Sequence, residues 1–217
     1  MSSAEAKDRI AAGPAPSEPW ETPEEEQEAA TFGMWIFLAT EVLFFGGMFL
    51  CYGVYRTLNP EGFLAGARET ELAIGTFNTV VLLTSSFTMI MAVKASPLGS
   101  RRLVWRCLAL TAALGVVFMA AKGYEYYLDF EKHVWPGPNF SIHVRGAAMF
   151  FALYWVMTGI HAIHLTIGIL IVGRLAWLMS GKTPLLLPDL ITIGLYWHFV
   201  DTVWMFLYPL LYLPGRA

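Results

Sequence analysis

Five long runs of apolar residues, separated by short polar breaks, dominate the pattern of this sequence. Each run approaches or exceeds the roughly 20 residues that an α-helix needs to cross a bilayer. The pattern predicts transmembrane helices at residues 32–55, 72–93, 103–124, 147–178 and 190–213. Turn-forming residues fill the breaks at 59–62, 96–100, 135–139 and 181–184. Because these connections are short, we expect consecutive helices to pack as antiparallel neighbours.

Composition supports a membrane protein. The 217 residues are 56% hydrophobic and 14% charged, whereas soluble domains carry roughly 25% charged residues. The predicted fold is therefore an all-α integral membrane bundle of about five transmembrane helices at residues 31–217. Residues 1–30 are rich in acids and proline, which is typical of a solvated, disordered tail.

The distribution of lysine and arginine indicates the orientation of the bundle. The cluster Arg101, Arg102 and Arg106 flanks the break after the second predicted helix. Basic residues are enriched on the cytoplasmic side of membrane proteins. We therefore expect a cytoplasmic N-terminus and an outer C-terminus in a multi-pass protein of a prokaryotic cytoplasmic (inner) membrane.

Several ionisable residues lie inside the apolar runs, where such groups are rare and need a partner. Glu41 near the middle of the first run is either an acid of a proton relay or a structural carboxyl paired with a histidine. His161 and His164 share one face of the fourth helix. They are either metal ligands or hydrogen-bond partners, for example of Glu41.

Two further pairs stand three residues apart. His198 and Asp201 lie on one face of the last helix, where we expect them to pair. Lys122 and Glu125 lie near the end of the third helix and can pair with each other or extend to the membrane interface. We expect this second pair to be a structural anchor, beside an aromatic belt formed by the neighbouring tyrosines.

The sequence lacks the motifs of a self-sufficient redox enzyme. No acid within the membrane has a histidine three positions on, as di-iron bundles require. There is no phosphate-binding loop, dinucleotide-binding glycine motif or zinc-protease motif. We therefore expect no catalytic, metal-binding or cofactor-binding residue in this chain, and no nucleic-acid partner.

Several motifs occur together in one order along the chain. They lie at residues 40–45 (TEVLFF), 78–86 (NTVVLLTSS), 114–118 (LGVVF), 125–127 (EYY), 158–168 (TGIHAIHLTIG) and 196–208 (YWHFVDTVWMFLY). With these motifs the chain resembles subunit III of haem–copper respiratory oxidases, over about residues 33–213. No apolar run precedes Phe32, so the resemblance is to the short, five-helix form.

The resemblance implies a non-catalytic subunit of a terminal oxidase in aerobic respiration. Catalytic subunit I and subunit II, with haem and copper, would be its partners, together with small subunits or a supercomplex. The subunit would support the stability and proton uptake of subunit I and bind phospholipid. Glu41 would be the family's intramembrane glutamate, with His164 and His161 as its partners. His198 and Asp201 would tie the last helix to the bundle.

The electron donor of such an oxidase, cytochrome c or quinol, stays open. Two alternative functions of the chain also stay open. The first alternative is an accessory subunit of nitric oxide reductase, which residues 154–159 favour. The second is a small transporter or proton channel in which Glu41, His164 and Asp201 form a relay.

Overall fold

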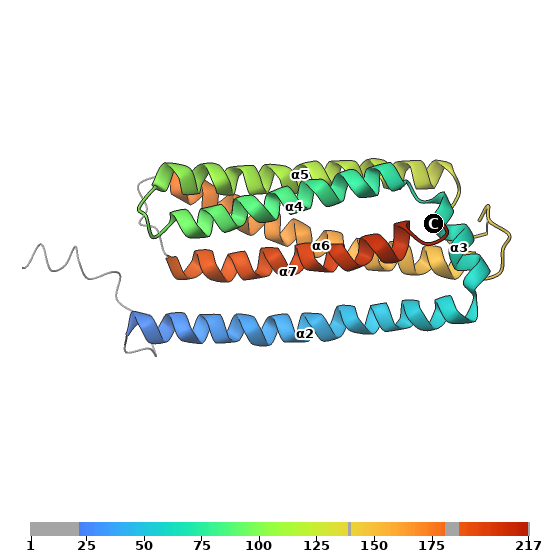
Figure 1. Ribbon diagram of the computed structural model, residues 1–217, viewed down its shortest axis with the longest axis horizontal. Helices are drawn as coiled ribbons and strands as arrows, with labels where there is room; N and C mark the ends of the chain where they lie inside the picture. The colour runs from blue at the N-terminus through green and yellow to red at the C-terminus, as the bar shows by residue number, and fades with distance from the viewer. Residues whose placement is uncertain (1–21, 139, 181–186, 217) are drawn as a thin grey trace, which may run out of the picture.

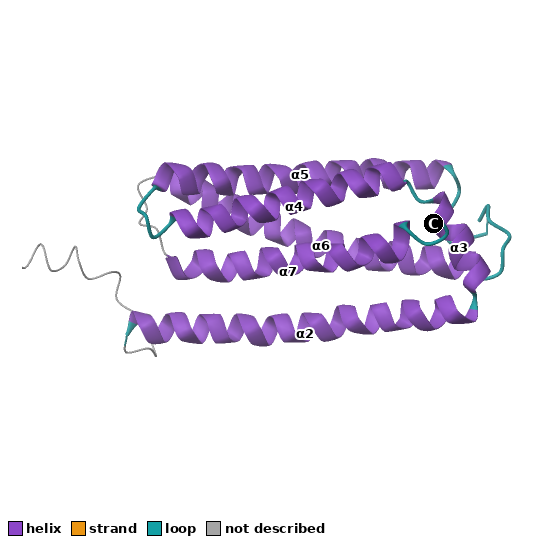
Figure 2. Cartoon of the chain, in the orientation of Figure 1, coloured by secondary structure: helices purple, strands orange, loops and turns teal. Residues whose placement is uncertain are grey.

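A computed structural model describes residues 22–138, 140–180 and 187–216. These residues form helices with connecting loops and no strand (Figures 1 and 2). The helices are α2 (Pro23–Leu58), α3 (Pro60–Glu69), α4 (Leu72–Ala95), α5 (Arg101–Glu131), α6 (Ala147–Ser180) and α7 (Leu187–Tyr212). Residues 1–21 of the predicted tail lie outside the described residues.

Five helical segments are long and apolar enough to cross a membrane. They are Glu28–Leu58, Leu72–Ala95, Arg101–Glu131, Ala147–Ser180 and Leu190–Tyr212. These are the five runs that the sequence predicts, most of them extended by a few residues. The prediction of an all-α, multi-pass membrane protein is confirmed. The cytoplasmic position of the N-terminus stays a prediction.

The first helix begins with a side-chain cap. The Thr22 hydroxyl accepts a hydrogen bond from the Glu25 amide at 3.2 Å, and Pro23 occupies the first helical position. Both features favour a helix start at this point. Residues 23–30, which the sequence pattern groups with the tail, therefore form the first turns of α2.

Helix α3 was not predicted, because its ten residues are too short and too polar for a membrane span. It lies across one end of the bundle, beside the C-terminus (Figure 1). A Cβ on Gly62 would overlap the backbone at Arg145 and Ala147, so glycine permits the close approach of α3 to α6. The Arg216 guanidinium donates to the carbonyls of Ala67, Arg68 and Thr70, which satisfies the last turn of α3.

The helices pack unequally. Helices α4 to α7 pack together, whereas α2 lies apart from α4 and α5 and touches α6 and α7 along one side of the bundle (Figure 1). In the most apolar stretch of each helix, half of the α7 residues are buried but only 11% of those in α2. Near its C-terminal end α2 is attached by the Tyr52 hydroxyl, which donates to the Leu210 carbonyl.

Candidate functional site

Glu41 and His164 meet where α2 passes α6. The Glu41 Oε2 and His164 Nε2 atoms are 3.1 Å apart, and each side chain is 17% exposed. His164 Nδ1 lies 2.9 Å from the Ile160 carbonyl, which can only accept, so Nδ1 carries a proton. The 3.1 Å separation is that of an ion pair when the imidazole is protonated, although the Glu41 Oε2 atom has no hydrogen bond among the described residues.

The Glu41 and His164 side chains line an apolar groove. This groove lies between α2 on one side and α6 and α7 on the other. The first part of this groove is a hollow of about 460 Å³, lined by Met34, Phe37, Glu41, His164, Ile167, Ile171, Ile193 and Tyr196. A second hollow of about 340 Å³ shares Ile171 and Ile193 with the first and contains Arg174. The groove thus leads from a cation near the helix ends to the Glu41–His164 pair.

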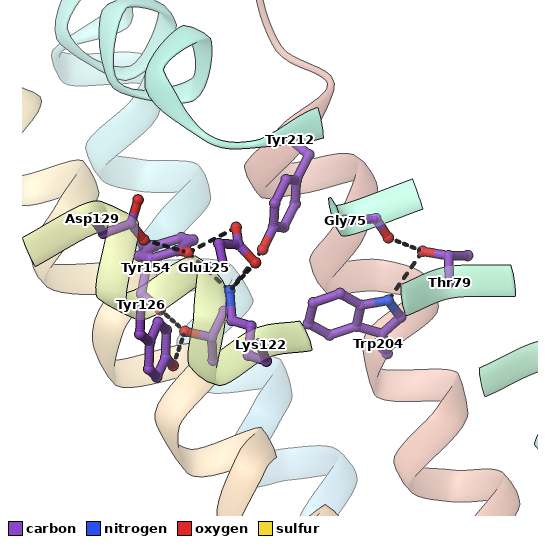
Figure 3. A network of polar contacts seen from close by, with 10 residues as sticks. Gly75, Thr79, Lys122, Glu125, Tyr126, Asp129, Tyr154, Trp204 and Tyr212 are labelled. Atoms are coloured by element: carbon purple, nitrogen blue, oxygen red, sulfur yellow. Dashed lines mark hydrogen bonds and ion pairs between the residues drawn. The ribbon is translucent and has the colours of Figure 1, made fainter. Parts of the chain in front are cut away.

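Lys122 is the centre of a buried polar network on α5, α6 and α7 (Figure 3). Its ammonium donates to Glu125 Oε2 at 3.0 Å and to the hydroxyls of Tyr154 and Tyr212 at 2.8 and 2.7 Å. The Tyr154 hydroxyl lies 3.0 Å from Glu125 Oε1 and 2.9 Å from Asp129 Oδ2. The Lys122 ammonium therefore binds one carboxyl group, that of Glu125, and the Tyr154 hydroxyl lies between the two carboxyl groups of Glu125 and Asp129.

This geometry decides between the two interpretations of the Lys122–Glu125 pair. The predicted pairing is present, but the two side chains are only 2% and 0% exposed, so they do not extend to the interface. Asp129 and Tyr154 were not among the predicted residues. Asp129 could have been found, because it follows Glu125 by four residues and so shares its helix face.

The predicted pairing of His198 with Asp201 is wrong. His198 Nδ1 instead lies 2.7 Å from the Ser86 hydroxyl of α4. Both carboxyl oxygens of Asp201 are buried without a hydrogen bond among the described residues. Residues three apart on a helix differ in direction by about 60°. This difference turns His198 toward the rim of the α4–α7 contact and Asp201 into it.

His161 does not contact Glu41 either. It is buried between Phe118 and Trp204, with ring centroids 5.8 and 5.3 Å away. Neither of its ring nitrogens has a hydrogen-bond partner within the described part of the chain. Of the two histidines that the sequence offers as partners of Glu41, only His164 takes that place.

Comparison with known proteins identifies the family. The family described as "Cytochrome c oxidase subunit III" matches residues 24–216. Cytochrome c oxidase subunit 3 of Synechocystis sp. is 32% identical over 187 residues, covering 84% of this chain and 74% of the relative. Quinol oxidase subunit 3 of Bacillus spizizenii is 32% identical over 199 residues, covering 91% and 93%.

A third relative is a longer protein. The haem–copper oxidase subunit I+III of Aeropyrum pernix is 31% identical over 205 residues, which cover 90% of this chain and 24% of that protein. These names do not favour a nitric oxide reductase accessory protein or a transporter. With its five apolar helices and the family match over residues 24–216, the chain belongs to the non-catalytic subunit III family of haem–copper respiratory oxidases.

Proposed function

We propose that this chain binds catalytic subunit I, next to subunit II, in a prokaryotic cytoplasmic membrane, where it supports the stability and proton uptake of subunit I. A subunit III implies a complex with other oxidase subunits. The name of the Aeropyrum pernix relative combines subunits I and III. That fusion supports subunit I as the direct partner, and the archaeal and bacterial relatives support a prokaryotic membrane.

The redox groups would belong to the partner subunits. Among the residues at 22–138, 140–180 and 187–216, no three His, Cys, Asp or Glu side chains come close enough to hold a metal ion. The histidines inside the membrane make other contacts: His164 with Glu41, His198 with Ser86, and His161 with two aromatic rings. These contacts support a structural or proton-holding role for this chain, with haem and copper elsewhere.

The Glu41–His164 pair is the observation that carries the proton-uptake role. Its carboxyl and imidazole stand 3.1 Å apart, so a proton shared by them would pass from one to the other without changing the net charge of the pair. Such a transfer avoids the large cost of a lone charge in hydrocarbon. In the complex, the pair would pass protons onward at little electrostatic cost when one proton leaves as another arrives.

The groove supports phospholipid binding. Its apolar walls suit an acyl chain, and Arg174 near the helix ends suits a headgroup phosphate. Native mass spectrometry of the whole complex tests this. Arg174→Gln should reduce the retained phospholipid, and Arg102→Gln, also exposed but on α5, is the matched control. Equal lipid retention in both variants would contradict lipid binding in the groove.

The proton-uptake role is tested by Glu41→Gln in the intact complex. Glutamine keeps a donor and an acceptor but cannot exchange a proton with His164. We expect most of the initial oxygen consumption to remain, and faster loss of activity during sustained turnover. Phe37→Leu, in the same groove, is the control. Complete loss of initial turnover in Glu41→Gln, or unchanged durability, would contradict the proposal.

A further inference from the structure

One imidazole faces the outside of the bundle within the depth of the membrane. His198 lines a hollow of about 180 Å³ on the outer side of α4 and α7, together with Ile90, Val93, Lys94, Ile191, Gly194 and Leu195. It follows the start of its span at Leu190 by eight residues, or about 12 Å at 1.5 Å per residue. That depth lies inside a hydrocarbon layer roughly 30 Å thick.

The outward nitrogen of this ring is unsatisfied. Nδ1 is held by the Ser86 hydroxyl, but Nε2 makes no hydrogen bond within the part of the chain that the structure describes. The surrounding face is apolar, with Phe87, Leu83 and Met205 exposed by 62, 49 and 43%. Lipid tails can cover these three side chains, but they can neither donate to nor accept from an imidazole nitrogen.

A second unsatisfied group stands behind the first. Asp201 is only 6% exposed, and neither of its carboxyl oxygens has a hydrogen bond among the described residues. The Ser86 side chain faces this carboxyl as well as His198, and its hydrogen bond is to the imidazole. Asp201, Ser86 and His198 thus form a line of polar groups from the α4–α7 contact to the surface, and the outer end of that line lacks a partner.

The contrast with Glu41 and His164 shows what is missing at His198. There, two ionisable side chains from different helices face each other within the chain, 3.1 Å apart. His198 has only the hydroxyl behind it. In hydrocarbon, ionisable side chains face a bundle interior or pair with another polar group. Lys94 lines the same hollow but makes no hydrogen bond to this nitrogen in the described part of the chain, so we expect the group that completes His198 to come from another polypeptide.

We infer that the α4–α7 face around His198 is the surface by which this subunit docks on a transmembrane helix of the catalytic subunit. We call this surface, formed by Leu83, Phe87, Ile90, His198 and Met205, the docking face. The partner helix presents a hydroxyl, amide or carboxyl group to His198 Nε2. This inference rests on the proposed function, since it presupposes that a catalytic subunit is bound.

Photo-crosslinking in the assembled complex tests the face without removing any polar group. A photoreactive phenylalanine analogue is placed at Phe87 or Met205 on the docking face. It is placed at Phe44 of α2 or Val117 of α5 as controls, because these side chains have a similar exposure of 48 and 42%. We expect at least about fivefold more crosslinked catalytic subunit from the docking face, since the analogue reacts only with groups in contact.

Every other outcome of the crosslinking contradicts either the docking face or the proposed function. Equal or greater crosslinking from α2 or α5, or crosslinks to a second copy of this chain or to lipid alone, overturns the docking face. If no haem–copper subunit accompanies the tagged wild-type chain out of the membrane, the proposed function itself fails. The two failures are therefore distinguishable in one experiment.

A pair of substitutions isolates the outward hydrogen bond. The amide nitrogen of Gln can occupy the place of Nε2, whereas Asn reaches only as far as Nδ1. We expect His198→Gln to keep most of the chain bound to tagged catalytic subunit through detergent washing. His198→Asn keeps the Ser86 contact but should bind roughly tenfold more weakly, as expected for a buried group left unpaired. Equal retention of the two variants, with equal amounts in the membrane, would contradict the docking role.

Discussion

The Lys122 network and the Glu41–His164 pair both place ionisable side chains inside the membrane, but the first is enclosed by other helices and the second is open to a groove. Lys122 is 1% exposed and is surrounded by Glu125, Tyr154 and Tyr212 from three helices. Glu41 and His164 are a single contact at the wall of an open groove. A closed network holds helices together, whereas an open pair remains accessible to protons, lipid or a partner. Substitutions should therefore reduce stability at the first and alter function at the second.

The largest effect is expected for Lys122→Met. It leaves the Glu125 carboxyl and two tyrosine hydroxyls without their common donor, and breaking a buried ion pair costs about 3–5 kcal/mol. Denaturant unfolding of the subunit in detergent measures this loss. The matched control is Lys132→Met, which removes the partly exposed Lys132–Glu71 pair and should cost about 1 kcal/mol or less. Similar losses in both variants would contradict the special role of the closed network.

A smaller loss is expected for Gly62→Ala, at the contact of α3 with α6. The added methyl would overlap backbone atoms of residues 145–147, and forced overpacking typically costs about 1–3 kcal/mol. Gly47→Ala is the control, because nothing lies within 4 Å of a Cβ there; it should leave stability unchanged or raise it slightly. The melting temperatures of the two variants compare them directly, and a loss for Gly47→Ala alone would refute the packing of α3.

His161→Phe should have almost no effect, within about 1 kcal/mol. The imidazole makes no hydrogen bond with the described residues and already lies between aromatic rings, so an aromatic ring of similar shape replaces it without leaving a donor unpaired. Thermal unfolding and oxygen consumption of the complex measure this. A collapse of either would show that His161 has a ligand or partner beyond the residues that surround it here.

The sequence predicts the spans well but sets one boundary too early. Hydropathy ends the third span at Tyr124, directly before Glu125, yet α5 continues to Glu131. The extension is possible because tyrosines of other helices hydrogen-bond to Lys122, Glu125 and Asp129. A hydropathy pattern counts such residues as polar and cannot include partners that only the fold supplies.

The candidate site was predictable only in part. The residue pattern predicts that Glu41 pairs with a histidine of another span, and the family resemblance implies His164 and His161 as its partners. The spacing of His198 and Asp201 places both side chains on a common helix face but does not make them touch. Helix geometry fixes the direction of each side chain, whereas the neighbouring helix decides which group that side chain contacts. That partner, Ser86, lies in a run of hydroxyl residues, 84–86, in which nothing distinguishes it by sequence alone.

The central claim is that the polar groups in the membrane contact one another, aromatic rings or a partner subunit, and that none of them holds the redox centre. The most direct test is the visible absorption spectrum of the complex, purified through a tag on this chain, before and after this chain is separated from it. We predict a haem Soret band in the complex that stays entirely with the partner polypeptides. A Soret band with stoichiometric haem in the separated chain would contradict the account.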